Sequence, residues 1–320
     1  MRTWVVALGS LFLGGHLSAQ THVMRPDADT PVFRAGVDLV ALSVVVTDQQ
    51  HRFVSGLGPE DFAVFEDGVE QDVSFFAATQ VPLDLALLLD TSASMLDKMD
   101  TMQQAALGFL STLRPTDRTT IVDIKDTVRI LYPLGHDVTA ANEAVLATAA
   151  RGGTALYNGL YLTLKEMVKQ RKANGDVRRQ AIAVLSDGED TASLLGYEDV
   201  MEQAKRAGIT LYTITLTSPR GGRESGFSGR RYFSQAEFAM KALAQETGAR
   251  AFFPTDIGEL AAVYDTIATE LANQYALGYT SNNARRDGGF RRVNVRVEAR
   301  PEMRTRTRSG YLASRITADY

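Results

Sequence analysis

The chain has 320 residues, of which 45% are hydrophobic and 22% charged, and its 34 basic and 38 acidic residues give a formal net charge of −4. This composition is ordinary for a globular protein, and the length predicts about two domains. Cysteine is absent, which excludes disulfides, iron–sulfur clusters, thiolate zinc sites and cysteine nucleophiles. The four histidines are scattered, which argues against a multi-histidine transition-metal site.

The N-terminus has the layout of a secretory signal peptide. Arg2 precedes an apolar run over residues 4–13, and small residues follow up to Ala19. This run is too short to span a bilayer, which takes about 20 residues. We therefore predict a signal peptide over 1–19, no transmembrane segment in the mature chain, and export to the periplasm or the extracellular space. The alternative is a buried N-terminal strand.

Residues 33–80 predict a small antiparallel β unit. Apolar side chains alternate from Val37 to Val45, and Glu66–Asp67–Gly68 is typical of a hairpin turn because glycine accepts a positive φ. Strand patterns return near the C-terminus, over residues 275–279, 291–297 and 303–311. We expect the C-terminal strands, within 274–314, to pack with the N-terminal unit in one β layer or in two neighbouring layers.

Between these flanks, residues 81–273 alternate strand and helix patterns. The stretch 83–89 is nearly all apolar, which favours a strand buried on both faces in a parallel sheet. Further strands are predicted over 119–124, 128–131, 181–186, 210–216 and 251–253. Helices are predicted over 95–113, 139–150, 155–171, 197–207, 235–247 and 257–273. The alternation predicts an α/β fold, a doubly wound, mostly parallel sheet with helices on both faces. One stretch rich in glycine and arginine, 218–234, predicts a loop.

The C-terminal segment is basic. From Gln274 to Tyr320 the sequence holds ten arginines, no lysine and four acidic residues. Such a segment can indicate binding to nucleic acid or to an anionic surface. Because the rest of the chain is acidic, we expect this segment to dock on the chain's own body, and we predict no nucleic-acid partner.

Oxygen-bearing side chains follow several predicted strands of the α/β region. Asp90, Ser92 and Ser94 form a D-x-S-x-S motif after the first core strand, Thr154 precedes a helix, and Asp187 follows another core strand. Ligands of such sheets bind outside the carboxyl ends of the strands, so we expect these side chains to converge. Two carboxylates that lie close together require a neutralising charge, and hard divalent cations prefer oxygen ligands. The set predicts bound Mg²⁺, with Mn²⁺ or Ca²⁺ as alternatives; the rival interpretation is that each residue caps a helix at a βα turn.

Together these residues resemble the metal-ion-dependent adhesion site of von Willebrand factor type A (VWA) domains, whose five positions Asp90, Ser92, Ser94, Thr154 and Asp187 match in order. The resemblance covers about residues 81–273 and implies a VWA fold, which is Rossmann-like. The flanking strands look like a secreted bacterial subgroup of that family. The resemblance also implies that the three hydroxyls bind the metal directly, that the two carboxylates act mainly through bound waters, and that an acidic residue of a protein partner takes the open position. The implied function is a secreted, metal-dependent adhesion or scaffolding module.

Other acidic residues near the motif have two interpretations. Glu189 and Asp190 either lie at the rim of the site, where they tune the choice of partner, or cap the following segment. Asp97 is interpreted as a charge in the first turn of a helix.

An enzyme is the main alternative of another class. A phosphotransferase of the haloacid-dehalogenase kind needs D-x-D-x-T, and here Ser92 occupies the second acidic position. The sequence has no G-x-S-x-G elbow, no P-loop, and no G-x-G-x-x-G after a core strand. We therefore predict that the chain is not an enzyme. A structural envelope protein with a vestigial site and a metal-dependent hydrolase remain the alternatives.

Overall fold

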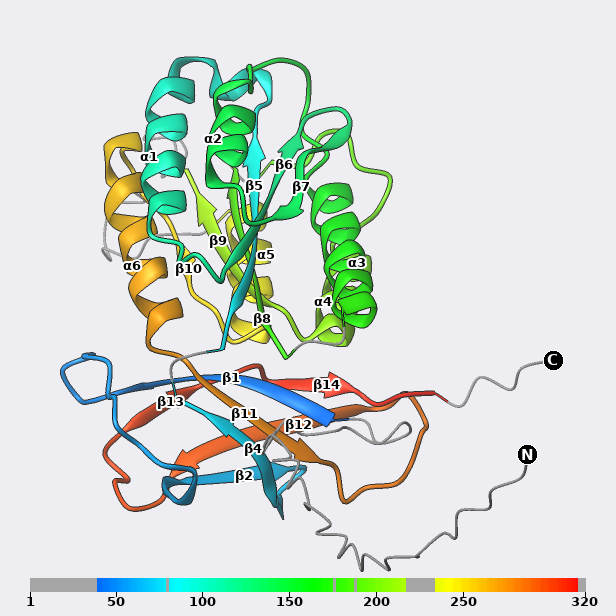
Figure 1. Cartoon of the computed structure of the whole chain (residues 1–320). Coiled ribbons are helices and arrows are strands. Elements are labelled where there is room, and N and C mark those ends of the chain that lie inside the picture. Colours follow the sequence, from blue (N-terminus) through cyan, green and yellow to red (C-terminus); the bar gives the residue numbers. More distant parts are fainter. Residues whose placement is uncertain (1–38, 79–80, 175–176, 187–188, 217–233, 316–320) are drawn as a thin grey trace, which may run out of the picture. The chain divides into compact units, whose positions relative to one another are not determined.

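A six-stranded sheet forms the centre of the α/β region (Figure 1). The computed structural model describes residues 39–78, 81–174, 177–186, 189–216 and 234–315. The strand order is β10-β9-β8-β5-β6-β7. The strands are β5 (Leu83–Asp90), β6 (Arg118–Ile124), β7 (Val128–Gly135), β8 (Arg179–Ser186), β9 (Thr210–Thr215) and β10 (Ala251–Phe252). All neighbouring pairs are parallel except β6 and β7, which are antiparallel.

Helices cover both faces of this sheet (Figure 1). They are α1 (Met99–Ser111), α2 (Val138–Leu146), α3 (Leu156–Asn174), α4 (Tyr197–Ala207), α5 (Gln235–Glu246) and α6 (Leu260–Ala272). Side chains of α1, α2 and α6 pack with Leu85, Leu87 and Leu89 on one face, whereas those of α3 and α4 pack with Ala86 and Leu88 on the other. Every residue of β5 is buried, as expected for a central strand between two helix layers. The predicted fold class is confirmed.

The flanking segments form two four-stranded sheets. One has the order β13-β1-β11-β4 and contains β1 (Leu39–Thr47), β4 (Val73–Ala77), β11 (Tyr275–Thr280) and β13 (Arg304–Arg306). The other has the order β14-β12-β2-β3 and contains β2 (Phe62–Glu66), β3 (Val69–Gln71), β12 (Phe290–Val297) and β14 (Gly310–Leu312). Strands from the two ends of the chain pair antiparallel, with Leu42 opposite Leu277 and Val64 opposite Val295. Their inward side chains share one apolar cluster, so the smaller β unit contains strands from both flanks.

Several predicted elements differ from the structure. The predicted helices over 95–113 and 257–273 each begin as a 3₁₀ turn, so that α1 starts at Met99 and α6 at Leu260. The helix predicted over 139–150 ends at Leu146. The single strand predicted over 303–311 is wrong, because its two halves, β13 and β14, belong to different sheets. Between them, the Ser309 N–H donates to the carbonyl of Glu246 on α5, which draws the chain out of one sheet before it enters the next. The bounds predicted for the domains stay predictions.

The basic C-terminal segment contacts the α/β region. Arg306 pairs with the buried Glu270 of α6, with Nη2 and Oε2 2.6 Å apart. The Ser309 hydroxyl also donates to the carboxylate of Glu246. This is the intramolecular docking that the sequence predicts. The predicted signal peptide lies outside the described residues, and so does the predicted loop 218–234 except for Ser234. Within the described parts of the chain, no helix is long and apolar enough to cross a membrane.

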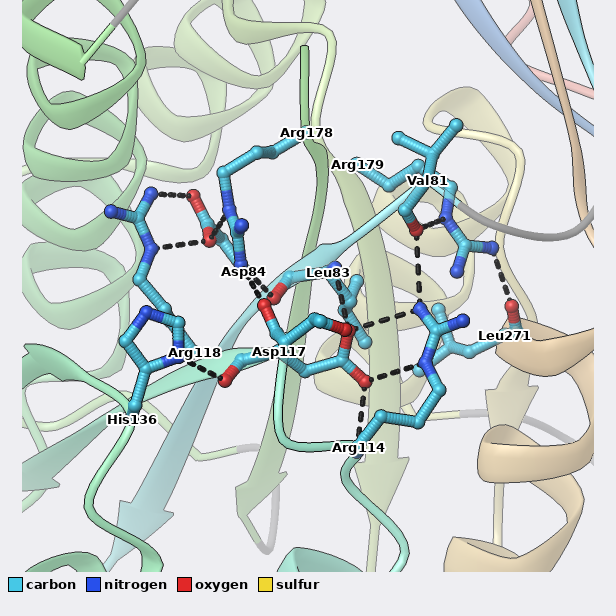
Figure 2. A network of polar contacts seen from close by, with 11 residues as sticks. Val81, Leu83, Asp84, Arg114, Asp117, Arg118, His136, Arg178, Arg179 and Leu271 are labelled. Carbon is cyan, nitrogen blue, oxygen red and sulfur yellow. Dashed lines mark hydrogen bonds and ion pairs between the residues drawn. The ribbon is translucent and has the colours of Figure 1, made fainter. Parts of the chain in front are cut away.

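Ion pairs hold the amino ends of the central strands together (Figure 2). Asp84 of β5 is 1% exposed and binds Arg118 of β6 at 2.7 Å and Arg178 at 2.6 Å. Beside it, Asp117 accepts hydrogen bonds from the Leu83 N–H and from Arg114. Burial alone would raise the pKa of the Asp117 carboxyl, but these hydrogen bonds outweigh it and the pKa lies below its usual value. The network therefore keeps a buried carboxylate charged.

Substitution of Asp84 by alanine should be strongly destabilising. It leaves the guanidinium groups of Arg118 and Arg178 in a poorly solvated place without their shared carboxylate, a change that costs about 3–5 kcal/mol. Urea unfolding measures the loss. The control Asp72→Ala, at an exposed position between β3 and β4, should change the free energy of unfolding by less than about 0.5 kcal/mol. Equal effects of the two substitutions would contradict the role of Asp84.

Candidate functional site

The candidate site lies at the carboxyl ends of the central strands. Asp90 is the last residue of β5, and Ser186 is the last residue of the neighbouring β8. The chain runs from β5 outward to β6 and β7, then returns through α3 to β8 on the other side of β5. Such a reversal leaves a crevice in which the loops after the two strands separate. The loops that follow β5 and precede α3 meet at this point.

Asp90 is completely buried, and both of its carboxylate oxygens are oriented by neighbours. The Ser92 N–H donates to Oδ1 at 2.9 Å, and the Ser186 hydroxyl donates to Oδ2 at 2.6 Å. These two donors fix the direction of the carboxylate. A buried carboxylate favours a nearby cation when it is ionised.

Two serines follow this carboxylate in the chain: Ser92 caps the 3₁₀ turn Ala93–Lys98, and Ser94 lies within it. Ser92 Oγ and Ser94 Oγ are 3.0 Å apart; Ser92 is buried, whereas Ser94 is exposed. Adjacent ligands of an octahedral Mg²⁺ at about 2.1 Å are separated by about 3.0 Å. The contact is a hydrogen bond between the two hydroxyls, and the same spacing is compatible with two neighbouring positions around such an ion.

Thr154 is brought to the same turn by backbone hydrogen bonds between the two loops. The Ala93 N–H donates to the carbonyl of Gly152 at 3.0 Å, and the Arg151 N–H donates to the carbonyl of Thr91 at 2.9 Å. Thr154 itself is 4% exposed, and its N–H donates to the Thr191 hydroxyl at 2.9 Å. The structure thus brings Asp90, both serines and Thr154 to one edge of the sheet. Asp187 lies outside the described residues.

Of the two acidic residues described after β8, Asp190 has a structural role and Glu189 is exposed. Asp190 accepts from the N–H of Tyr157 in the first turn of α3 and from the N–H of Ser193, both at 2.9 Å. It is therefore a capping residue, which was one of its two predicted interpretations. Burial and the charge of Asp190 raise the pKa of Tyr157, so that this phenol stays neutral. Glu189 is exposed beside it.

Two acidic residues, one near the end of β6 and one in the turn after it, support the site and were missed in the sequence. Asp123, at the end of β6, accepts a hydrogen bond from Thr91 and pairs with Lys125, with Oδ2 and Nζ 3.0 Å apart. Asp126 accepts from the Gly153 N–H at 2.6 Å and so fixes the loop before Thr154. The sequence places both residues at the carboxyl end of a core strand, where the site was predicted to lie, and this position could have pointed to them.

The donor set fits a hard divalent cation. Its members in the described part of the chain are three hydroxyls and one carboxylate, all oxygen ligands. No group of three or more His, Cys, Asp or Glu side chains that could hold a metal occurs among the described residues. This composition disfavours the softer metals, which prefer nitrogen and sulfur ligands.

The model of the von Willebrand factor type A domain matches residues 84–266, more than half of the chain. The chain belongs to the von Willebrand factor type A domain family. No curated protein sequence matches it. Among solved structures, it is similar to a von Willebrand factor type A protein from Catenulispora acidiphila, with 16% identity over 75% of this chain and 52% of that one, and a TM-score of 0.49. This chain thus spans about half the length of that protein.

Two further structures resemble the VWA chain. The conserved hypothetical protein BatB from Bacteroides thetaiotaomicron is 15% identical over 59% of this chain and 98% of that one, with a TM-score of 0.45. Proximal thread matrix protein 1 from the mussel byssus is 15% identical over 60% of this chain and 48% of that one, with a TM-score of 0.48.

Substitution of Gly152 by alanine should destabilise the VWA domain by about 1–3 kcal/mol. Gly152 has a φ of +73°, and a Cβ there would lie 2.1 Å from Oδ2 of Asp126. Thermal or urea unfolding measures the cost. The matched control is Gly108→Ala in α1, where a Cβ meets nothing within 4 Å; it should stabilise the protein by about 0.5–1 kcal/mol. A neutral Gly152→Ala substitution would show that the loop before Thr154 is not constrained.

Proposed function

We propose that this VWA chain is an exported, divalent-metal-dependent protein-binding module. Ser92, Ser94 and Thr154 would hold Mg²⁺ directly, and Asp90 and Asp187 would hold it through water, with Mn²⁺ or Ca²⁺ as alternatives. When bound, the ion would supply a positive charge and an open coordination position for the carboxylate of a partner protein. The observation that carries the proposal is the pair of serine hydroxyls, 3.0 Å apart, in the turn whose Ser92 N–H orients the carboxylate of Asp90.

The protein's own residues have distinct tasks in this scheme. Asp90 is held in one direction by the Ser92 N–H and the Ser186 hydroxyl, so its oxygens need no rearrangement when a cation binds. Asp126 and the hydrogen bond between Ala93 and Gly152 keep the loop of Thr154 against the turn of the serines. Ser94 is exposed, so a partner can approach the site from its side. The sequence pattern over 1–19 supports export.

The histidines of the described segments are not placed to act as a base for the serines of the site. A serine nucleophile needs a base within hydrogen-bond reach. Of the two histidines in the described segments, His136 binds the carbonyl of Asp117 at the opposite end of the sheet (Figure 2), and His51 lies in the turn after β1. Neither is near Ser92 or Ser94. A structural envelope protein with a vestigial site remains the rival function, and metal binding separates the two.

Magnesium should stabilise the folded protein. A ligand that binds only the folded state adds about 2.7 kcal/mol at 100 times its dissociation constant. We expect thermal unfolding of the full chain to shift upward in MgCl₂ relative to EDTA. Asp90→Ala, Thr154→Ala and Ser94→Ala should lose this shift, and the exposed position of Ser94 makes its variant the least disturbing to the fold. Asp97→Asn, exposed on the same turn, is the matched control and should keep the shift. A metal-dependent shift that persists in all three site variants would refute the assignment.

Partner binding should depend on the same ion. When the immobilised full chain captures proteins from envelope and secreted fractions, the specific partner should be retained in Mg²⁺, released by EDTA and absent with Ser94→Ala, as read by mass spectrometry. Replacement of the contacting Asp or Glu of the captured partner by its amide should abolish retention. Partners retained equally in EDTA would place binding on another surface.

A further inference from the structure

A cavity lined by arginines lies away from the candidate metal site. Its volume is about 400 Å³, and its walls come from β1, β11, the C-terminal ends of α3 and α4, and the segment around Tyr311. Five arginines line it: Arg171, Arg178, Arg179, Arg206 and Arg308. None of the lining residues in the described part of the chain is an aspartate or glutamate. Basic side chains therefore outnumber acidic ones on its described walls, which favours an anionic ligand.

Two of the arginines are neutralised by carboxylates outside the cavity. Arg178 pairs with Asp84 at 2.6 Å, and Arg206 pairs with Glu202 at 2.6 Å. Both pairs belong to the surrounding structure, so these two side chains need no further partner.

The other three arginines have no carboxylate partner among the described residues. Arg171 donates to the carbonyl of Ala207 at 3.0 Å, and Arg179 donates to two backbone carbonyls. Arg308 forms no hydrogen bond or ion pair with any described residue, and its Nε is buried without an acceptor. Its guanidinium lies over the ring of Tyr311, 5.4 Å from the centroid. A buried donor without an acceptor costs stability unless a ligand or water satisfies it.

Burial lowers the pKa of Arg308 to about 10, and the positive charge of Arg171 contributes to the shift. Burial likewise lowers the pKa of Arg171. Both groups remain protonated at neutral pH, so like charges face one cavity without a counter-ion from the described chain. An oxyanion between them would relieve this repulsion, because the guanidinium fork matches the geometry of a carboxylate or phosphate.

The remaining wall is largely apolar, with Val40, Leu42, Val81 and Leu277 among its residues. The volume falls within the range of about 300–1,000 Å³ typical of sites for small organic ligands, and it exceeds what a bare phosphate ion fills. The lining therefore suits a molecule with an anionic head and a short apolar body.

We propose that this cavity binds a small organic oxyanion, whose carboxylate or phosphate lies between Arg171 and Arg308 and whose apolar part packs against β1 and β11. The site is independent of the proposed metal site. Arg178 and Arg179 stand at the amino end of β8, whereas Asp90 and Ser186 stand at the carboxyl ends of their strands.

Calorimetry and thermal unfolding of the full chain in EDTA test the proposal, with hexyl phosphate, hexanoate, inorganic phosphate and hexanol as probes at matched ionic strength. Hexyl phosphate or hexanoate should bind saturably with one site per chain and raise the unfolding temperature, and hexanol should not. The tighter of the two anions identifies the head group. Inorganic phosphate should bind at least tenfold more weakly than the better of the two; equal affinity would overturn the assignment of the apolar wall.

Arg308→Gln should weaken binding of the better anion tenfold or more, as expected for loss of a charge-assisted hydrogen bond. Arg304→Gln removes an exposed arginine from the same segment and should bind as the wild type does. Arg171→Gln serves as the second site variant if Arg308→Gln does not fold, and it should show the same loss. Equal affinities of the site and control variants, binding of hexanol as tight as that of the anions, or no saturable binding of any anion would each refute the proposal.

Discussion

The structure depends on one buried strand that carries an aspartate near each end. All residues of β5 are buried, and burial of a carboxylate is costly unless hydrogen bonds or opposite charges stabilise it. The amino-end carboxylate, Asp84, is neutralised by Arg118 of β6 and by Arg178, which precedes β8. The carboxyl-end carboxylate, Asp90, is oriented by a backbone N–H and a serine hydroxyl. One end of the strand therefore fixes the sheet, and the other places an oriented carboxylate at the loops that carry the hydroxyls of the candidate site.

Polar contacts of the C-terminal segment form a second constraint, because they join the flanking sheets to the α/β region. Arg306 neutralises the buried Glu270, and Ser309 binds Glu246 of α5. These contacts draw the chain from one sheet to the other between β13 and β14. The arginine between them, Arg308, is placed at the cavity wall without an acidic partner among the described residues. The segment between β13 and β14 thus docks on the α/β region. It also places the Arg308 guanidinium where a small anion can accept its hydrogen bonds.

Local patterns predicted the elements well wherever the deciding interactions were local. The predicted helix over 197–207 has the observed bounds, because Gly208 in a left-handed conformation ends it. The prediction of one strand over 303–311 was wrong. The Ser309 N–H between its two halves bonds to the carbonyl of Glu246, which is far away in the sequence. For the candidate site, the motif residues of the β5 turn and Thr154 could be named in advance. Asp123 and Asp126 could not be assigned, since their roles depend on which loops lie beside β6.

By itself, the sequence determined the fold class, and it predicted that the candidate site lies at the carboxyl ends of the parallel strands. Apolar periodicity records burial on one or two faces, and the order of strands and helices restricts the topology to a doubly wound sheet. Only the tertiary structure decided which side chains share a charge or a cavity, because ion pairs such as Arg178 with Asp84 join residues about a hundred positions apart. The arginine cavity is the clearest case. Its members come from helix ends and strands that no pattern in the sequence relates to one another, and only packing brings them together.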